Sequence, residues 1–181
     1  MRRQLLPALR ALLAFTVVTG LLYPLAMTGV AQALFKERAD GSLVRRGDRV
    51  VGSSLLGQRF ESDRYFHPRP SAAQYDGGAS GPSNLGPSNP ELLRLRRERT
   101  LDYRRTNGLG ADVDVPNDAV TASASGLDPH ISVRNAGLQV QRVARSRDLA
   151  ADAVLRLVHQ IAGEGRVNVL ELNLALDRLR R

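Results

Sequence analysis

Ala11-Leu-Leu-Ala-Phe-Thr-Val-Val-Thr-Gly-Leu-Leu-Tyr-Pro-Leu-Ala-Met-Thr-Gly-Val-Ala-Gln-Ala-Leu-Phe35 is an uncharged stretch of 25 residues between Arg10 and Lys36. A transmembrane helix needs about 20 mainly apolar residues to cross roughly 30 Å of hydrocarbon. This stretch is long enough to span a bilayer with some tilt. The remaining residues are polar and fit one domain. The sequence therefore predicts a tail (residues 1–10), a transmembrane helix (residues 11–35) and one domain (residues 36–181).

The N-terminus also has the three regions of a secretory signal peptide, because two arginines precede the apolar stretch and Ala31-Gln32-Ala33 resembles a cleavage site. However, the apolar stretch is about twice as long as a usual signal core. Gly20 and Pro24 also interrupt it, as is common in membrane helices. We therefore expect an uncleaved anchor, and the alternative is a secreted binding module released after Ala33.

The charges on the two sides of the stretch bear on its orientation. Residues 1–10 contain three arginines and no acid, which favours a cytoplasmic N-terminus. A plain count of the other side favours the reverse, since it holds Lys36, Arg38, Arg45, Arg46 and Arg49. Long translocated domains weaken that count. We expect a single-pass protein of the cell inner membrane with its N-terminus in the cytoplasm and its domain outside.

The stretch itself contains no Asp, Glu, Lys, Arg or His. A lone apolar helix offers no ion pathway and no proton relay, so the chain is not expected to carry ions by itself. Small or backbone-perturbing residues recur every four positions, and such faces allow close helix packing in lipid. These candidate interface residues are Thr16, Gly20, Pro24 and Thr28; the alternative is an anchor with incidental small residues.

The composition narrows the function classes. The net charge of +8 is carried almost wholly by scattered arginines, and aromatic residues make up only 4% of the chain. Base stacking needs aromatic side chains, so no nucleic-acid partner is expected. The absence of cysteine excludes disulfides and thiol chemistry.

Local patterns predict an α+β domain. Leu43-Val44 and Val50-Val51 flank a turn at Gly47-Asp48, which indicates a hairpin, with a further strand at residues 54–60. Residues 65–90 are rich in Pro and Gly and predict a long loop. The fold class is therefore one N-terminal transmembrane helix followed by a single mixed α/β extracytoplasmic domain.

Helix signals follow in the second half. Asn89-Pro90-Glu91 starts a helix that runs to about Arg105, with Asn107-Gly108 as its stop. Residues 120–126 are expected to be extended. A second helical region begins at Ile131-Ser132, and a third is capped by Asp148 and ended by Gly163. Residues 167–179 favour a helix with a capping box formed by Asn168 and Glu171.

The search for catalytic chemistry is negative. No two of the three histidines have metal-ligand spacing, and no nucleophile elbow or P-loop is present. No catalytic residue, no metal site and no firmly bound cofactor are predicted for this chain.

Two segments are denser in small hydroxyl and amide groups than chance, namely residues 80–89 and 121–131. Such segments bind a partner's backbone or cradle an anion on exposed N–H groups. Their other explanation is turn and capping chemistry. The interface candidates in them are Ser80, Gly81, Ser83, Asn84, Leu85, Ser125, Gly126, Leu127, Asp128, Pro129 and His130.

An ordered set of strings covers nearly the whole chain and resembles the C subunit family of the Kdp potassium-transporting ATPase. The strings are residues 52–58 (GSSLLGQ), 65–72 (YFHPRPSA), 80–90, 121–131, 139–144 (QVQRVA), 167–170 and 172–177 (LNLALD). One departure is Pro82, where the family pattern usually has Gly. Pro82 limits the freedom of the backbone and weakens the case for a phosphate-wrapping loop.

The resemblance implies an accessory, non-catalytic subunit of an ATP-driven potassium import complex. The implied partners are a channel-like potassium-binding subunit, a P-type ATPase subunit and membrane lipid. The family is described as a catalytic chaperone that raises the ATP affinity of the ATPase subunit, so ATP is expected only through the complex. A domain outside the cytoplasm would leave about ten residues facing the nucleotide. The alternative is a nucleotide-binding regulator whose domain is cytoplasmic.

Overall fold

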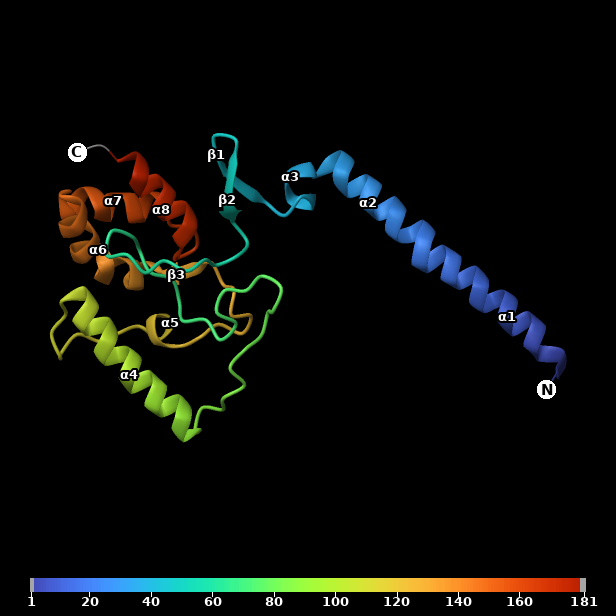
Figure 1. Ribbon diagram of the computed structural model, residues 1–181, viewed down its shortest axis with the longest axis horizontal. Coiled ribbons are helices and arrows are strands. Elements are labelled where there is room, and N and C mark those ends of the chain that lie inside the picture. Colours follow the sequence, from blue (N-terminus) through green and yellow to red (C-terminus); the bar gives the residue numbers. More distant parts are fainter. Residues whose placement is uncertain (1, 180–181) are drawn as a thin grey trace. The chain divides into compact units, whose positions relative to one another are not determined.

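The computed structural model describes residues 2–179 and divides into two units, Met1–Leu43 and Val44–Arg181 (Figure 1). The first unit is a helical rod followed by one short helix. The rod consists of α1 (Arg2–Val17), a π-helical turn η1 (Val18–Leu22) and α2 (Tyr23–Leu34). The short helix is α3 (Lys36–Ala39). The rod is long and apolar enough from Arg3 to Leu34 to cross a membrane.

The second unit begins with the predicted hairpin of β1 (Leu43–Arg46) and β2 (Arg49–Ser53), which straddles the boundary between the units. Gly47 lies in the two-residue turn with a φ of 61°, a conformation that glycine adopts without strain. The strand expected at residues 54–60 does not form. Side chains instead bond to backbone groups in this region. Ser53 Oγ accepts from Leu55 N, and Gln58 Nε2 donates to the Val51 carbonyl.

The long loop predicted for residues 65–90 is confirmed, and α4 (Pro90–Asn107) follows it. The helix begins and ends as its sequence indicates. Asn89 accepts a hydrogen bond from Glu91 N, and Gly108 closes the helix in the left-handed conformation at φ 64°.

The C-terminal half contains the remaining elements: α5 (Asn117–Val120), β3 (His130–Ser132), α6 (Val133–Arg147), α7 (Ala151–Ile161), β4 (Arg166–Asn168) and α8 (Val169–Arg178). Strands β3 and β4 pair antiparallel with Ile131 opposite Val167. Helices α6, α7 and α8 pack their apolar faces together with these two residues and with Phe66, which is fully buried.

Three local predictions in this half are wrong. Residues 120–126 are not extended throughout, because Val120 ends α5 and Gly126 has a φ of 68°, although Thr121 is extended. Ile131 belongs to β3, and α6 starts only after Ser132, which caps it. Asp148 adopts φ 58° and ends α6 instead of starting α7, which has no side-chain cap and ends at Ile161. The N-cap half of the capping box predicted for the last helix is confirmed, with Asn168 Oδ1 accepting from Glu171 N at 3.2 Å.

Buried amide side chains hold the loop that precedes α4 against the helical core. Asn173 on α8 accepts from Phe66 N at 2.8 Å and donates to the Phe66 carbonyl at 3.0 Å. Gln139 on α6 makes the same two bonds to His67, since its Oε1 accepts from His67 N at 2.7 Å and its Nε2 donates to the His67 carbonyl at 3.1 Å. Each amide therefore replaces one residue of a neighbouring strand and satisfies a backbone that has no sheet partner.

Arg142 on α6 extends this network. Its guanidinium donates to the carbonyls of Asp63 and Tyr65, to Asn107 and to Gln139, at 2.8–2.9 Å. Burial lowers the pKa of Arg142, yet several oxygens surround the charge. The network joins α4, α6 and the loop, and this fixes the loop that carries the candidate site.

Candidate partner-binding site

The two polar segments that the sequence singles out lie side by side. Gly81 N donates to the Ser125 carbonyl at 2.9 Å, and Ser80 Oγ donates to the same oxygen at 3.1 Å. The loop containing Ser71 joins them, because Ser71 Oγ donates to the Gly126 carbonyl at 2.6 Å. Segments separated by about 45 residues in the chain are thereby fastened at Ser125.

Gly126 is the point where these loops approach most closely. Its φ is 68°, and a Cβ atom placed there would lie 2.8 Å from Ala73 Cβ and 3.0 Å from the Gly81 carbonyl oxygen. Only glycine fits this position, on grounds of both backbone conformation and space. The glycine of this turn-forming segment is therefore explained by loop packing within the domain.

An open depression of ≈ 750 Å³ lies over this junction. Its floor is apolar and includes Leu127 and Pro129, both buried. Leu55 and Leu56 line it and are 60% and 40% exposed. The polar lining consists of Arg69, Ser80, Ser123, Ser125, Asp128 and Arg166. Sequence reasoning missed Leu55, Leu56, Arg69 and Arg166 as site residues; a Leu-Leu pair between turn residues was the only available signal.

An ion pair closes one side of the depression. Arg69 Nη1 lies 2.9 Å from Asp128 Oδ2, and Asp128 Oδ1 accepts from His130 N at 3.0 Å. Arg69 Nε is buried without a hydrogen-bond partner among the described residues. Tyr75 donates its hydroxyl to the Arg69 carbonyl, and burial raises the pKa of Tyr75 to about 12. The carboxylate of Asp128 is thus held by the fold.

The other predicted residues of the loops have different places. Ser83, Asn84 and Leu85 do not line the depression, and Ser83 and Asn84 are exposed. Pro82 is also exposed. His130 is in β3, with its Nδ1 3.5 Å from Asp128 Oδ1. Within residues 2–179, no group of three or more His, Cys, Asp or Glu side chains is arranged to hold a metal ion.

The four predicted residues of the apolar helix belong to the other unit and lie around the π turn. Tyr23 N donates to the Val18 carbonyl, an i to i+5 bond, just before Pro24. Pro24 has no N–H and its ring needs space, and a widened turn supplies that space.

The π turn changes which residues share a face. In a regular α-helix, residues four apart rotate by about 40° per step, so Thr16 and Thr28 would differ by about 120°. The extra residue in a π turn removes about 100° of that rotation. The turn therefore brings Thr16, Gly20, Pro24 and Thr28 close to one line, and a Cβ at Gly20 would lie 4.0 Å from Thr16 Cγ2.

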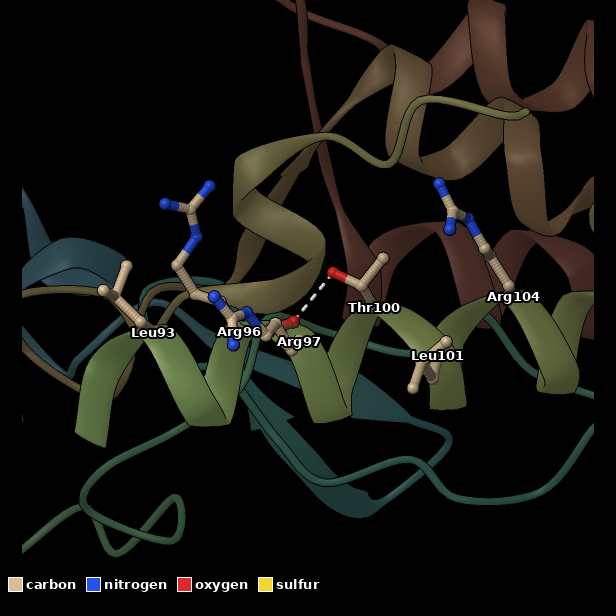
Figure 2. Close-up of a pocket in the computed structure, with 6 residues that line it drawn as sticks. All are labelled: Leu93, Arg96, Arg97, Thr100, Leu101 and Arg104. Atoms are coloured by element: carbon tan, nitrogen blue, oxygen red, sulfur yellow. Dashed lines mark hydrogen bonds between the residues drawn. The ribbon is translucent and has the colours of Figure 1, made fainter. Parts of the chain in front are cut away.

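A second surface feature runs along α4 and is shown in Figure 2. A groove of ≈ 480 Å³ is lined by Leu93, Arg96, Arg97, Thr100, Leu101 and Arg104. Thr100 Oγ1 bonds the Arg96 carbonyl at 2.7 Å, and the Arg104 guanidinium donates to the Val113 carbonyl. Two arginines of α4 thus attach the connector of residues 108–118, since Arg96 also donates to Asn117 Oδ1 at 3.1 Å.

Comparison with known proteins identifies the family. The model of the family described as "KdpC: K+-transporting ATPase, c chain" matches residues 5–178. The chain belongs to this family. It is 54% identical to the potassium-transporting ATPase KdpC subunit of Mycobacterium tuberculosis, over 99% of this chain and 100% of that protein. It is 48% identical to the KdpC subunit of Cereibacter sphaeroides, over 98% of each chain. The family that the ordered strings indicate is therefore confirmed.

Proposed function

We propose that this chain is the accessory, non-catalytic subunit of an ATP-driven potassium import complex, and that the depression at residues 55–56, 69, 80 and 123–129 receives a segment of a partner subunit. One observation carries the proposal. Four strings in which the chain resembles the family, residues 52–58, 65–72, 80–90 and 121–131, all contribute to this one depression. An apolar floor with a polar rim is the composition of a protein interface.

The apolar helix holds the subunit in the inner membrane, with the N-terminus in the cytoplasm and the domain outside. The line of Thr16, Gly20, Pro24 and Thr28 packs against a helix of the channel-like potassium-binding subunit. A face with little side-chain bulk lets two backbones approach closely in lipid. The partners are this subunit and the P-type ATPase subunit.

In this arrangement ATP and the domain lie on opposite sides of the membrane. Any gain in ATP affinity of the ATPase subunit then arises because this chain binds one state of the complex more tightly than another. A catalytic-chaperone role is thus a coupling between sites and requires no contact of this domain with the nucleotide.

The test is recovery of the complex after co-expression with the other subunits. Leu55→Asp places a charge on the exposed wall of the depression and is expected to lower co-purification by about 10-fold, because an anchoring side chain contributes about 1–2 kcal/mol or more. The control is Leu155→Asp on α7, which replaces another exposed leucine outside the depression. Equal recovery of both variants would refute the depression as the docking surface.

A further inference from the structure

The hairpin of β1 and β2 has an outer face that is both apolar and cationic. Leu43 and Val50 are 46% and 42% exposed. Leu43 and Arg45 share a face because alternate residues of a strand point to the same side. The two-residue turn sets Arg45 opposite Val50. Arg45 therefore lies on this face, whereas the turn sets Arg49 opposite Arg46, at the end of β2 on the other side. Both arginines are exposed, and neither side chain has a partner among residues 2–179.

The opposite side of the hairpin is attached to the domain. Arg46 Nη1 lies 3.1 Å from Asp177 Oδ2 on α8, and the Val51 carbonyl accepts from Gln58 Nε2 at 3.0 Å. Val44 and Val51 are partly buried. These contacts on the reverse side leave the face with Leu43 and Val50 turned away from the domain.

The chain also limits how far the hairpin lies from the end of the apolar helix. Eight residue steps separate Phe35, the C-cap of α2, from Leu43. At about 3.5 Å per residue these steps reach about 28 Å, and the helical turn α3 shortens that reach. If the apolar helix spans a bilayer, this short connection allows the hairpin to reach the headgroup layer.

The charges of this region favour lipid as the occupant. Residues 36–49 contain five cations and three anions. Asp40 accepts from Gln32 Nε2, and Arg46 is paired with Asp177. The core of a protein interface is depleted in charge, whereas here the exposed Arg45 shares the face of Leu43 and Val50, and the exposed Arg49 is next to Val50 in the strand. Apolar residues flanked by arginines next to a span are typical of segments that bind anionic headgroups.

We propose that the outer face of this hairpin lies in the headgroup layer, where Leu43 and Val50 contact the lipid and Arg45 binds anionic phospholipid headgroups from the same face. The long side chain of Arg49 binds headgroups from the end of β2 beside the turn. This inference rests on the proposed membrane anchoring. It also gives the basic residues after the span a role in binding headgroups, separate from any influence on the orientation of the helix. The domain is thereby attached to the membrane at a second point besides its helix.

The chain has no cysteine, so a single introduced thiol is a unique label. The experiment uses the full chain with Val50→Cys carrying an environment-sensitive fluorophore, in vesicles of phosphatidylcholine with or without phosphatidylglycerol, and a spin-labelled lipid as quencher. Quenching is expected with phosphatidylglycerol. In Arg45→Gln/Arg49→Gln it is expected to fall to the neutral-lipid level, because each arginine near an anionic surface contributes roughly 5-fold in binding.

Two controls match these variants. Leu155→Cys labels a residue that is 38% exposed on α7 and is expected to remain unquenched. Arg97→Gln/Arg145→Gln removes two exposed arginines elsewhere and is expected to leave the quenching of the fluorophore at position 50 unchanged.

The outcomes separate this inference from the proposed function. A chain that floats with the vesicles but shows no quenching at position 50, or equal quenching in neutral lipid, overturns the headgroup contact alone. Shielding of the fluorophore only after the other subunits are added also overturns it, in favour of a protein interface. A chain that does not float with vesicles overturns the anchoring on which both proposals rest.

Discussion

At the scale of the residue, Gly126 is the position in the candidate site that least tolerates a larger side chain. Gly126→Ala is expected to lower the free energy of unfolding of the full chain in detergent by roughly 2–3 kcal/mol. The added Cβ meets Ala73 and Gly81, and φ 68° strains any other L-residue. Denaturant unfolding measures the loss.

A control variant separates the clash of the added Cβ from the strain of a positive φ. Gly108 has a similar φ of 64° but nothing within 4 Å of its would-be Cβ, so Gly108→Ala is expected to cost only roughly 1 kcal/mol. Equal losses for the two variants would contradict the close packing of the three loops.

A second residue with a defined consequence is His67. Burial and the nearby positive charge of Arg142 lower the pKa of its imidazole from 6.5. The unfolded chain therefore binds a proton first as the pH falls. The stability that depends on neutral His67 is complete above pH 6.5 and is lost as the pH falls through the folded-state pKa.

His67→Gln is accordingly expected to reduce the decline of stability between neutral pH and about pH 5. Urea unfolding midpoints measured across this range give the result, with the exposed His159→Gln as control. An unchanged pH profile in His67→Gln would remove His67 as a source of acid sensitivity.

These residues also show where sequence reasoning stops. Gly126 and Ser125 stand out as turn formers, but their partners Ala73, Gly81 and Ser71 are distant in the chain. Asn173 and Gln139 have the composition of ordinary polar helix residues. Their role as substitutes for a strand depends on the loop that reaches them, and no local pattern records it.

At the scale of the element, the accurate predictions depend on neighbouring residues. The caps of α4 and the N-cap of α8 each involve residues at most a few positions apart. The turn of the hairpin is similarly local. The predictions at Asp148 and Ile131 are wrong because each residue is compatible with two local structures, and tertiary contacts select one. For Ile131 that contact is strand pairing, since β3 exists only because β4 pairs with it.

The helix η1 supports a prediction for the apolar rod. Gly20→Leu is expected to weaken co-purification with the channel-like subunit by about 10-fold, because a bulky side chain separates two helices that pack closely. Gly29→Leu is the control, since Gly29 lies off the line of Thr16, Gly20, Pro24 and Thr28 and has nothing within 4 Å. Unchanged recovery of Gly20→Leu would exclude Gly20 from the interface.

At the scale of the whole molecule, the placement of the domain decides between the two functional explanations. The three arginines of residues 1–10 favour a cytoplasmic N-terminus, and the five cations of residues 36–49 oppose it by simple count. If those cations bind headgroups, their number reflects lipid contact and no longer argues for a cytoplasmic domain.

Orientation is measured with an impermeant thiol reagent on intact cells. Ser83→Cys changes an exposed residue that does not line the depression. Labelling in intact cells is expected, whereas Leu5→Cys near the N-terminus should react only after lysis. Protection of the thiol at position 83 until lysis would place the domain with ATP and support the nucleotide-binding regulator. Labelling of both positions in intact cells would contradict a single-pass anchor, because one span separates its two ends.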